Sequence, residues 1–174
     1  MSGLGLALTG IAMVAAADAT AAASAPCPNC NVVWVTMDTT RADRMGFLGN
    51  KSKLTPNIDR HAAASRVFPN AFSHAPETLQ SVSAFFSGRY RANNGMDFDL
   101  AETTRYHSLS PEVTTIAEVF SKQGYATVGF NANPVIAEGK GYSFGLNQGF
   151  QRWEHGDDAA MAAAAVQYLG ATTD

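Results

Sequence analysis

The sequence predicts an α/β fold with a mostly parallel sheet. Segments of strand and helix character alternate along the chain, which is typical of a parallel sheet flanked by helices. The first strand segment, residues 31–37, is a short apolar run rich in valine, as expected for a strand buried on both faces. A polar run, residues 38–43, follows at the carboxyl end of this strand, where open α/β sheets bind their ligands.

The next elements also have local signals. We predict a helix over residues 55–65, with Thr55 as its cap and Pro56 at its first position. Residues 66–72 form the second predicted strand. A helix over residues 77–86 follows, and a glycine two residues later closes it.

The polar, asparagine-rich stretch 89–110 predicts a surface loop. Thr115 and Glu118 have the spacing of a capping box, in which each residue bonds the backbone N–H of the other. They predict the start of a helix that ends at Gly124.

The last part of the chain contains one predicted strand and one predicted helix. The strand covers residues 125–130. Glycines and turn residues then predict loops up to residue 158, and an alanine-rich helix covers residues 159–169 and ends at Gly170. Three strands alternating with helices make a thin sheet, and the pattern stops soon after a helix.

The composition excludes one class of partner. The chain has 12 Lys and Arg residues against 15 Asp and Glu residues, with a formal net charge of −3. These charges are scattered, so no basic surface for a phosphate backbone is indicated. We therefore expect no nucleic-acid partner. The hydrophobic fraction of 46% is typical of a folded protein.

Residues 1–26 predict a signal peptide. Residues 3–17 are almost entirely small and apolar, and the segment 23–25 matches the small-residue cleavage pattern. The apolar run is short for a membrane span. We expect export to the periplasm or the extracellular space, with no membrane span after cleavage. No Lys or Arg precedes the apolar run, so a non-cleaved anchor and a misread start codon remain alternatives.

The two cysteines, Cys27 and Cys30, are separated by two residues. A structural zinc site needs four ligands, and these two have no ligand-like partners. We expect a small disulfide-bonded loop in an oxidising compartment. A small redox or metal module and lipid attachment at Cys27 are the alternatives.

Four stretches, taken in order, resemble the sulfatases of the alkaline-phosphatase-like superfamily: NVVWVTMDTTRADRMGFLGN (31–50), TPNIDRHAAASRVFPNAFSHAP (55–76), TLQSVSAFFSGRY (78–90) and TTIAEVFSKQGYATVGF (114–130). A fifth segment, GLNQGFQRW (145–153), is similar to a GLDQGF-type segment of that family. The resemblance implies that residues 27–174 are the N-terminal part of a sulfatase-type catalytic domain. The fold would then be a partial alkaline-phosphatase-like fold, with its C-terminal part and its remaining metal ligands missing.

The resemblance also implies a metal site. Asp38 matches the family's first metal-binding aspartate, which would hold one divalent cation, Ca²⁺ or Mg²⁺. Thr39 replaces a second aspartate found in many members, and it is expected to be a weak ligand or none. Arg41 and Asp43 are expected to order the loop.

Thr78 matches the position of the family's nucleophile, beside the metal. The usual residue there is Cys or Ser, which is oxidised to formylglycine, and a threonine is not expected to give that aldehyde. Gln80 replaces the proline and Val82 the arginine of the motif, so Ser81 is the one match inside its core. Ser81 and His74, four residues before Thr78, are candidate substrate contacts.

Several interpretations remain open for Thr78 and for the protein. Thr78 is either a nucleophile or a plain helix cap. The leading function is hydrolysis of a sulfate ester of a small molecule or glycan. The alternatives are a phosphoethanolamine- or phosphoglycerol-type transferase or a phosphodiesterase of the same superfamily, and a non-catalytic truncated remnant. This chain alone is expected to be inactive. Residues 129–133 stand where the family has a lysine-containing segment, so that lysine has no counterpart.

Overall fold

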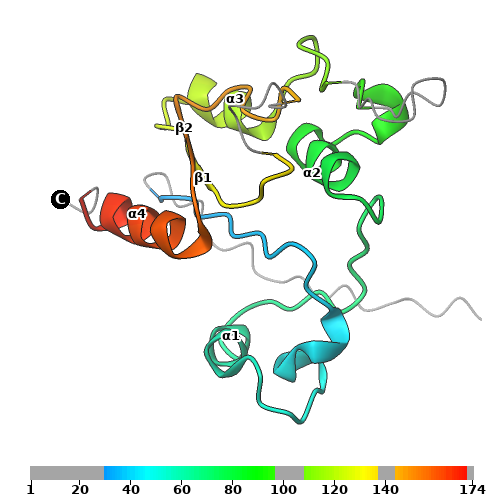
Figure 1. The fold of residues 1–174 in the computed structure, drawn as a ribbon, viewed down its shortest axis with the longest axis vertical. Helices are drawn as coiled ribbons and strands as arrows, with labels where there is room; N and C mark the ends of the chain where they lie inside the picture. The colour runs from blue at the N-terminus through cyan, green and yellow to red at the C-terminus, as the bar shows by residue number, and fades with distance from the viewer. Residues whose placement is uncertain (1–29, 97–107, 137–143, 172–174) are drawn as a thin grey trace, which may run out of the picture. The chain divides into compact units, whose positions relative to one another are not determined.

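The computed structural model describes residues 30–96, 108–136 and 144–171 (Figure 1). The chain divides into two compact units, Met1–Thr36 and Met37–Asp174. The predicted signal peptide lies outside the described residues. Among the described residues, no helix combines the length and the apolar character needed to cross a membrane.

Cys30 is the first described residue, and it is disulfide-bonded. Cys27, its expected partner, lies outside the described residues.

Residues 31–37 form no strand, contrary to the prediction from their apolar pattern. Their side chains are exposed, and that of Val35 is 78% exposed. The indole N–H of Trp34 donates to Thr36 Oγ1 at 3.0 Å. A strand requires a neighbour for its backbone hydrogen bonds, and no described segment pairs with this one. The apolar pattern of residues 31–37 therefore did not reveal whether a neighbouring strand would pair with them.

The predicted strand at residues 66–72 was also wrong, because this segment is an irregular chain with a turn. Its aromatic residues, Phe68 and Phe72, are exposed, the second by 88%. The β-type residues here have no sheet neighbour within the described part of the chain.

The second unit contains regular elements in this order: η1 (Ala42–Arg44), η2 (Gly46–Leu48), α1 (Pro56–Ala62), α2 (Thr78–Ser87), η3 (Arg91–Asn93), α3 (Ile116–Lys122), β1 (Val128–Asn131), β2 (Arg152–His155) and α4 (Asp158–Ala171). All four α-helices predicted from the sequence are present. Gly88 ends α2 in the left-handed conformation, as predicted, with φ of 64°. Gly170, predicted to end the last helix, lies inside α4.

Strands β1 and β2 pair in parallel, with Val128 opposite Arg152 and Asn131 opposite His155. The sheet is therefore parallel, as predicted. The sequence placed the first of these strands too early and missed β2 among the glycine-rich turns. Gly129 lies against the indole ring of Trp153, which occupies the space that a side chain at residue 129 would need.

Helix α4 packs against β1 (Figure 1). The ring centroids of Phe130 and Tyr168 lie 6.0 Å apart. Asp157, directly before the helix, caps its start, because its Oδ1 accepts the backbone N–H of Ala160 at 2.8 Å.

A small apolar core forms around one face of α2. Its buried members come from α2 and from residues outside the helices and strands: Leu79, Val82, Met96, Leu109, Val113 and Leu146. The predicted surface loop at residues 89–110 is wrong for Asn94 and Met96, which are both fully buried. The Asn94 amide donates to Ser83 Oγ at 3.1 Å, and its Oδ1 accepts the N–H of Met96 at 2.9 Å. These bonds satisfy the polar groups that the loop brings into the core.

The capping box of α3 is present as predicted. Glu118 N–H donates to Thr115 Oγ1 at 3.2 Å, and Thr115 N–H donates to Glu118 Oε2 at 2.8 Å. Gln148, from the loop before β2, donates to Glu118 Oε2 at 2.9 Å and to the carbonyl of Val113 at 2.7 Å. The Thr115 hydroxyl donates to the carbonyl of Gln148 at 2.9 Å. The start of α3 is therefore bound to a loop 30 residues further along the chain.

We predict that Glu118 makes stability pH-dependent below about pH 4.5. The backbone N–H of Thr115 and the amide of Gln148 lower the pKa of the Glu118 carboxyl from its ordinary value of 4.5. Its contribution is therefore complete above that value and is lost as the pH falls through the lower pKa of the folded state. The measurement is the urea midpoint of the whole protein between pH 7 and pH 3. Glu118→Gln should reduce the loss of stability on acidification, whereas Glu112→Gln, at an exposed position, should not.

We predict that Gly149→Ala destabilises the protein more than Gly88→Ala. Both glycines have a left-handed backbone, with φ of 87° and 64°. An added Cβ at residue 149 would lie 2.5 Å from the backbone nitrogen of Glu118, whereas at residue 88 it would meet nothing within 4 Å. Gly88→Ala should cost about 1–2 kcal/mol of unfolding free energy from backbone strain alone. Equal losses in the two variants, measured by urea unfolding, would contradict the close approach of this loop to α3.

Candidate active site

Three segments that are distant in the sequence meet at the carboxylate of Asp38. Its Oδ2 accepts a hydrogen bond from Thr78 Oγ1 at 3.0 Å. The same oxygen accepts a second hydrogen bond from Asn133 Nδ2. Its Oδ1 accepts the backbone N–H of Thr39 at 2.8 Å. The structure thus brings together Asp38 and Thr78, which the family resemblance had implied would lie beside the same metal ion.

The backbone turns sharply directly after Asp38. Thr39 has a φ of 56°, a left-handed conformation that is rare for a β-branched residue. The Thr40 hydroxyl donates to the carbonyl of Asp38 at 3.2 Å, which supports the turn. A strained residue of this kind costs on the order of 1–3 kcal/mol and persists where surrounding bonds determine the conformation. In this turn the backbone N–H of Thr39 points back at the Asp38 carboxylate.

Thr78 is the first residue of α2 and is not its cap. The extended residue before it, Glu77, occupies the N-cap position, and no side chain caps the helix. The Thr78 hydroxyl donates to Asp38 instead. The start of a helix carries partial positive charge and backbone N–H groups suited to an anion. The next residue, Leu79, lies in the core and anchors this end of the helix.

Asn133 follows the end of β1 by two residues. Its backbone N–H donates to Asn131 Oδ1 at 2.9 Å, and its own Oδ1 accepts the N–H of Val135 at 2.8 Å. The amide nitrogen is directed at Asp38. Asn133 was not predicted as a site residue, because the family resemblance implies a lysine in the segment 129–133. An asparagine just after a parallel strand is the signal that was available.

The other residues selected from the sequence have different partners. Ser81 shares a hydrogen bond of 2.6 Å with Ser73 Oγ. The His74 ring packs edge-on against Tyr90, with centroids 4.7 Å apart. The hydroxyl of Thr39 makes no hydrogen bond to a described residue, and only its backbone reaches Asp38.

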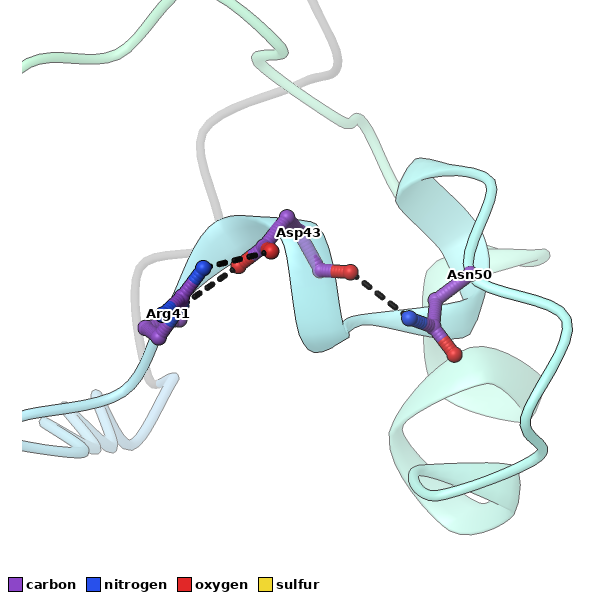
Figure 2. A network of polar contacts seen from close by, with 3 residues as sticks. All are labelled: Arg41, Asp43 and Asn50. Atoms are coloured by element: carbon purple, nitrogen blue, oxygen red, sulfur yellow. Dashed lines mark hydrogen bonds and ion pairs between the residues drawn. The ribbon is translucent and has the colours of Figure 1, made fainter.

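Arg41 and Asp43 pair with each other, as Figure 2 shows. Two bonds of 2.9 Å join the guanidinium to the carboxylate, and Asn50 Nδ2 donates to the backbone carbonyl of Asp43 at 2.7 Å. The guanidinium lowers the pKa of Asp43. Both side chains are largely exposed, so solvent screens the pair. These residues order the loop after Asp38, as expected.

The side-chain oxygens around Asp38 are of the type that binds a hard cation, but they are fewer than such a cation needs. Carboxylate and hydroxyl oxygens are the ligands that Mg²⁺ and Ca²⁺ prefer. A carboxylate offers about four lone-pair positions, and three at Asp38 already accept hydrogen bonds. Within the described ranges there is no group of three or more His, Cys, Asp or Glu side chains that could hold a metal ion. The side-chain oxygens described around Asp38 are therefore too few to hold such an ion by themselves.

Comparison with known proteins identifies a family for nearly all of the described chain. The family model described as Sulfatase matches residues 30–172.

Individual relatives agree with this match. The chain is 31% identical over 98 residues to an arylsulfatase of Clostridium perfringens, a match that covers 56% of this chain and 19% of that protein. It is 36% identical over 83 residues to the N-acetylgalactosamine-6-sulfatase of Canis lupus familiaris, covering 48% and 16%. It is 31% identical over 120 residues to the steryl-sulfatase of Mus musculus, covering 66% and 19%. The matched part thus spans about a fifth of these relatives or less, and no solved structure matches significantly.

Proposed function

This chain belongs to the sulfatase family, and we propose that the whole protein hydrolyses a sulfate ester with Thr78 as its nucleophile. The observation that carries this proposal is the hydrogen bond of 3.0 Å from Thr78 Oγ1 to Asp38 Oδ2. It pairs a hydroxyl at the start of a helix with a carboxylate, which is the arrangement that activates a weak nucleophile.

The geometry supports a specific sequence of bond changes. The hydrogen bond directs the Thr78 proton toward Asp38, and in-line attack on sulfur would use a lone pair of the same hydroxyl oxygen. Attack forms a bond from Thr78 Oγ to sulfur, passes the Thr78 proton to Asp38 and breaks the bond from sulfur to the alcohol oxygen, which takes a proton from solvent and leaves as the alcohol. Water then attacks sulfur and breaks the bond from sulfur to Thr78 Oγ, which regains its proton from Asp38, while inorganic sulfate leaves and the proton of the attacking water passes to solvent. The positive end of α2 favours the anionic group during both steps.

We also propose that the whole protein holds one divalent cation, Mg²⁺ or Ca²⁺, at Asp38, with Thr39 and Thr78 as neutral oxygen ligands. Bound there, the cation would supply positive charge that favours the alkoxide of Thr78. Formylglycine is not expected in this protein, because a threonine stands at the nucleophile position.

The threonine itself supports a second candidate function. A sulfatase-type nucleophile is usually Cys or Ser, and the motif's arginine is replaced here by Val82, which is buried in the core. A threonine with this environment also suits attack on phosphorus. The alternative is therefore a phosphodiesterase, or a transferase that passes a phosphoethanolamine or phosphoglycerol group to an acceptor.

The substrate class follows from the same chemistry. We propose that the substrate is a sulfate or phosphate ester of a small molecule or a glycan. The protein would act on it after export from the cytoplasm. Ser81 and His74 are candidate substrate contacts, since both lie near the start of α2 in the sequence.

We predict that Thr78→Ala lowers kcat of the whole protein by at least about a thousandfold, because loss of a nucleophile removes the covalent route. Thr78→Ser should keep measurable activity, because it retains the hydroxyl. The measurement is steady-state hydrolysis of an aryl sulfate and of a phosphodiester by each variant. The relative rates on the two esters decide between the two candidate functions.

The matched control for this experiment is Thr114→Ala, which removes an exposed threonine before α3. It should leave kcat unchanged. Full activity in Thr78→Ala would refute Thr78 as the nucleophile. A wild-type protein without activity on either ester would favour a non-catalytic remnant.

We predict that Asp38→Ala abolishes saturable binding of Mg²⁺ or Ca²⁺ to the whole protein, measured by calorimetry with the metal alone. Asp43→Ala is the control, since that carboxylate belongs to the same polar run but pairs with Arg41. Its metal affinity should match that of the wild type. Equal binding by the wild type and Asp38→Ala would place the cation elsewhere.

A further inference from the structure

We propose that Asn133 is a positioning residue that fixes the Asp38 carboxylate against Thr78. The inference rests on the proposed function and assigns a new residue to it. Asn133 Nδ2 and Thr78 Oγ1 donate to the same atom, Asp38 Oδ2, although the two residues lie 95 and 40 positions from Asp38 in the sequence. The orientation of the nucleophile's partner is therefore set by the segment after β1.

The local structure fixes which end of the Asn133 amide faces Asp38. Its Oδ1 accepts the backbone N–H of Val135 at 2.8 Å, which closes a turn through the side chain. The oxygen is thus committed to the turn, and the nitrogen is the end that reaches the carboxylate. The residue has two separable roles, an acceptor in the turn and a donor to Asp38.

Asn131 anchors this turn to the sheet. Its side chain is only 7% exposed, its Oδ1 accepts the N–H of Asn133 at 2.9 Å, and its Nδ2 donates to the Asn133 carbonyl at 3.3 Å. The carbonyl of Asn131 faces His155 Nδ1 of β2 at 3.0 Å. The parallel pairing of β1 with β2 therefore determines where the Asn133 amide lies.

The donor has a physical effect on Asp38. Asp38 is exposed, and without a fixed donor its carboxylate would rotate and exchange its partners with water. The Thr39 N–H holds Oδ1, and the Asn133 amide holds Oδ2, so the two oxygens are fixed separately. With Oδ2 fixed, the Thr78 hydroxyl has one acceptor in one place. Hydrogen bonds to a charged group are stronger than those between neutral groups, which suits this role.

The substitution Asn133→Asp separates the two roles. A carboxylate has nearly the shape of the amide, and it still accepts the N–H of Val135, so the turn is kept. It has no proton to donate at neutral pH, and it repels Asp38. Asn133→Ala removes both the acceptor and the donor. Asn57→Asp, at an exposed position of α1, adds the same charge elsewhere and is the matched control.

The experiment measures kcat and KM of the whole protein separately for the three variants, with the aryl sulfate or phosphodiester that the wild type prefers. We expect kcat to fall about 10–100-fold in Asn133→Asp and in Asn133→Ala, the range for partners that orient a site residue. KM should change little, because the residue acts through Asp38. Asn57→Asp should match the wild type in both constants. Mg²⁺ binding to each variant is measured by calorimetry as a readout independent of turnover.

Each other outcome overturns the inference in a distinct way. If Asn133→Asp keeps the wild-type kcat while Asn133→Ala loses it, the residue serves only the turn. If Asn133→Asp binds Mg²⁺ more tightly and reacts faster, the position belongs to a metal ligand rather than to a positioning donor. If KM rises while kcat is unchanged, Asn133 binds substrate instead. If wild-type activity is absent, or survives Thr78→Ala, the proposed function has failed and this inference fails with it.

Discussion

The packing of one face of α2 is the constraint on which the candidate site depends. Leu79 and Val82 are buried against loop residues that include Met96 and Leu146. Each buried side chain of this size stabilises the folded state by about 1.5–3 kcal/mol. Because Leu79 directly follows Thr78, the same packing that stabilises the helix also fixes the position of Thr78, the proposed nucleophile. The Thr78 hydroxyl is thus held in place by the apolar packing of the next residue, Leu79.

A second constraint connects the segment 145–153, which runs into β2, to the rest of the second unit. Gln148 bonds both the capping box of α3 and the carbonyl of Val113, and the chain then enters β2. β2 holds β1 in register, and the residues after β1 reach Asp38. The family-like segment thus has a structural role that its sequence did not reveal. It contributes to the site by fixing the strand that carries Asn131 and Asn133.

The family signature and the regular structure coincide only in part. The four helices follow the sequence signals, and the capping box has both of its predicted hydrogen bonds. The segment 31–37 resembles the family's first strand, but it forms no strand and is exposed. Helix signals are local, since each turn bonds within itself, whereas a strand depends on a partner elsewhere in the chain. Membership of the sulfatase family is carried by the sequence and does not require that this strand be paired here.

The sequence by itself determined the family, the helices and two members of the candidate site, Asp38 and Thr78, because short motifs and capping signals are encoded locally. It did not determine that Asp38 and Thr78 share a hydrogen bond, nor that Asn133 donates to the same oxygen. It also did not predict β2, whose partner lies 24 residues earlier. These features depend on contacts between residues that are far apart in the chain, and only the tertiary structure decides which distant groups meet.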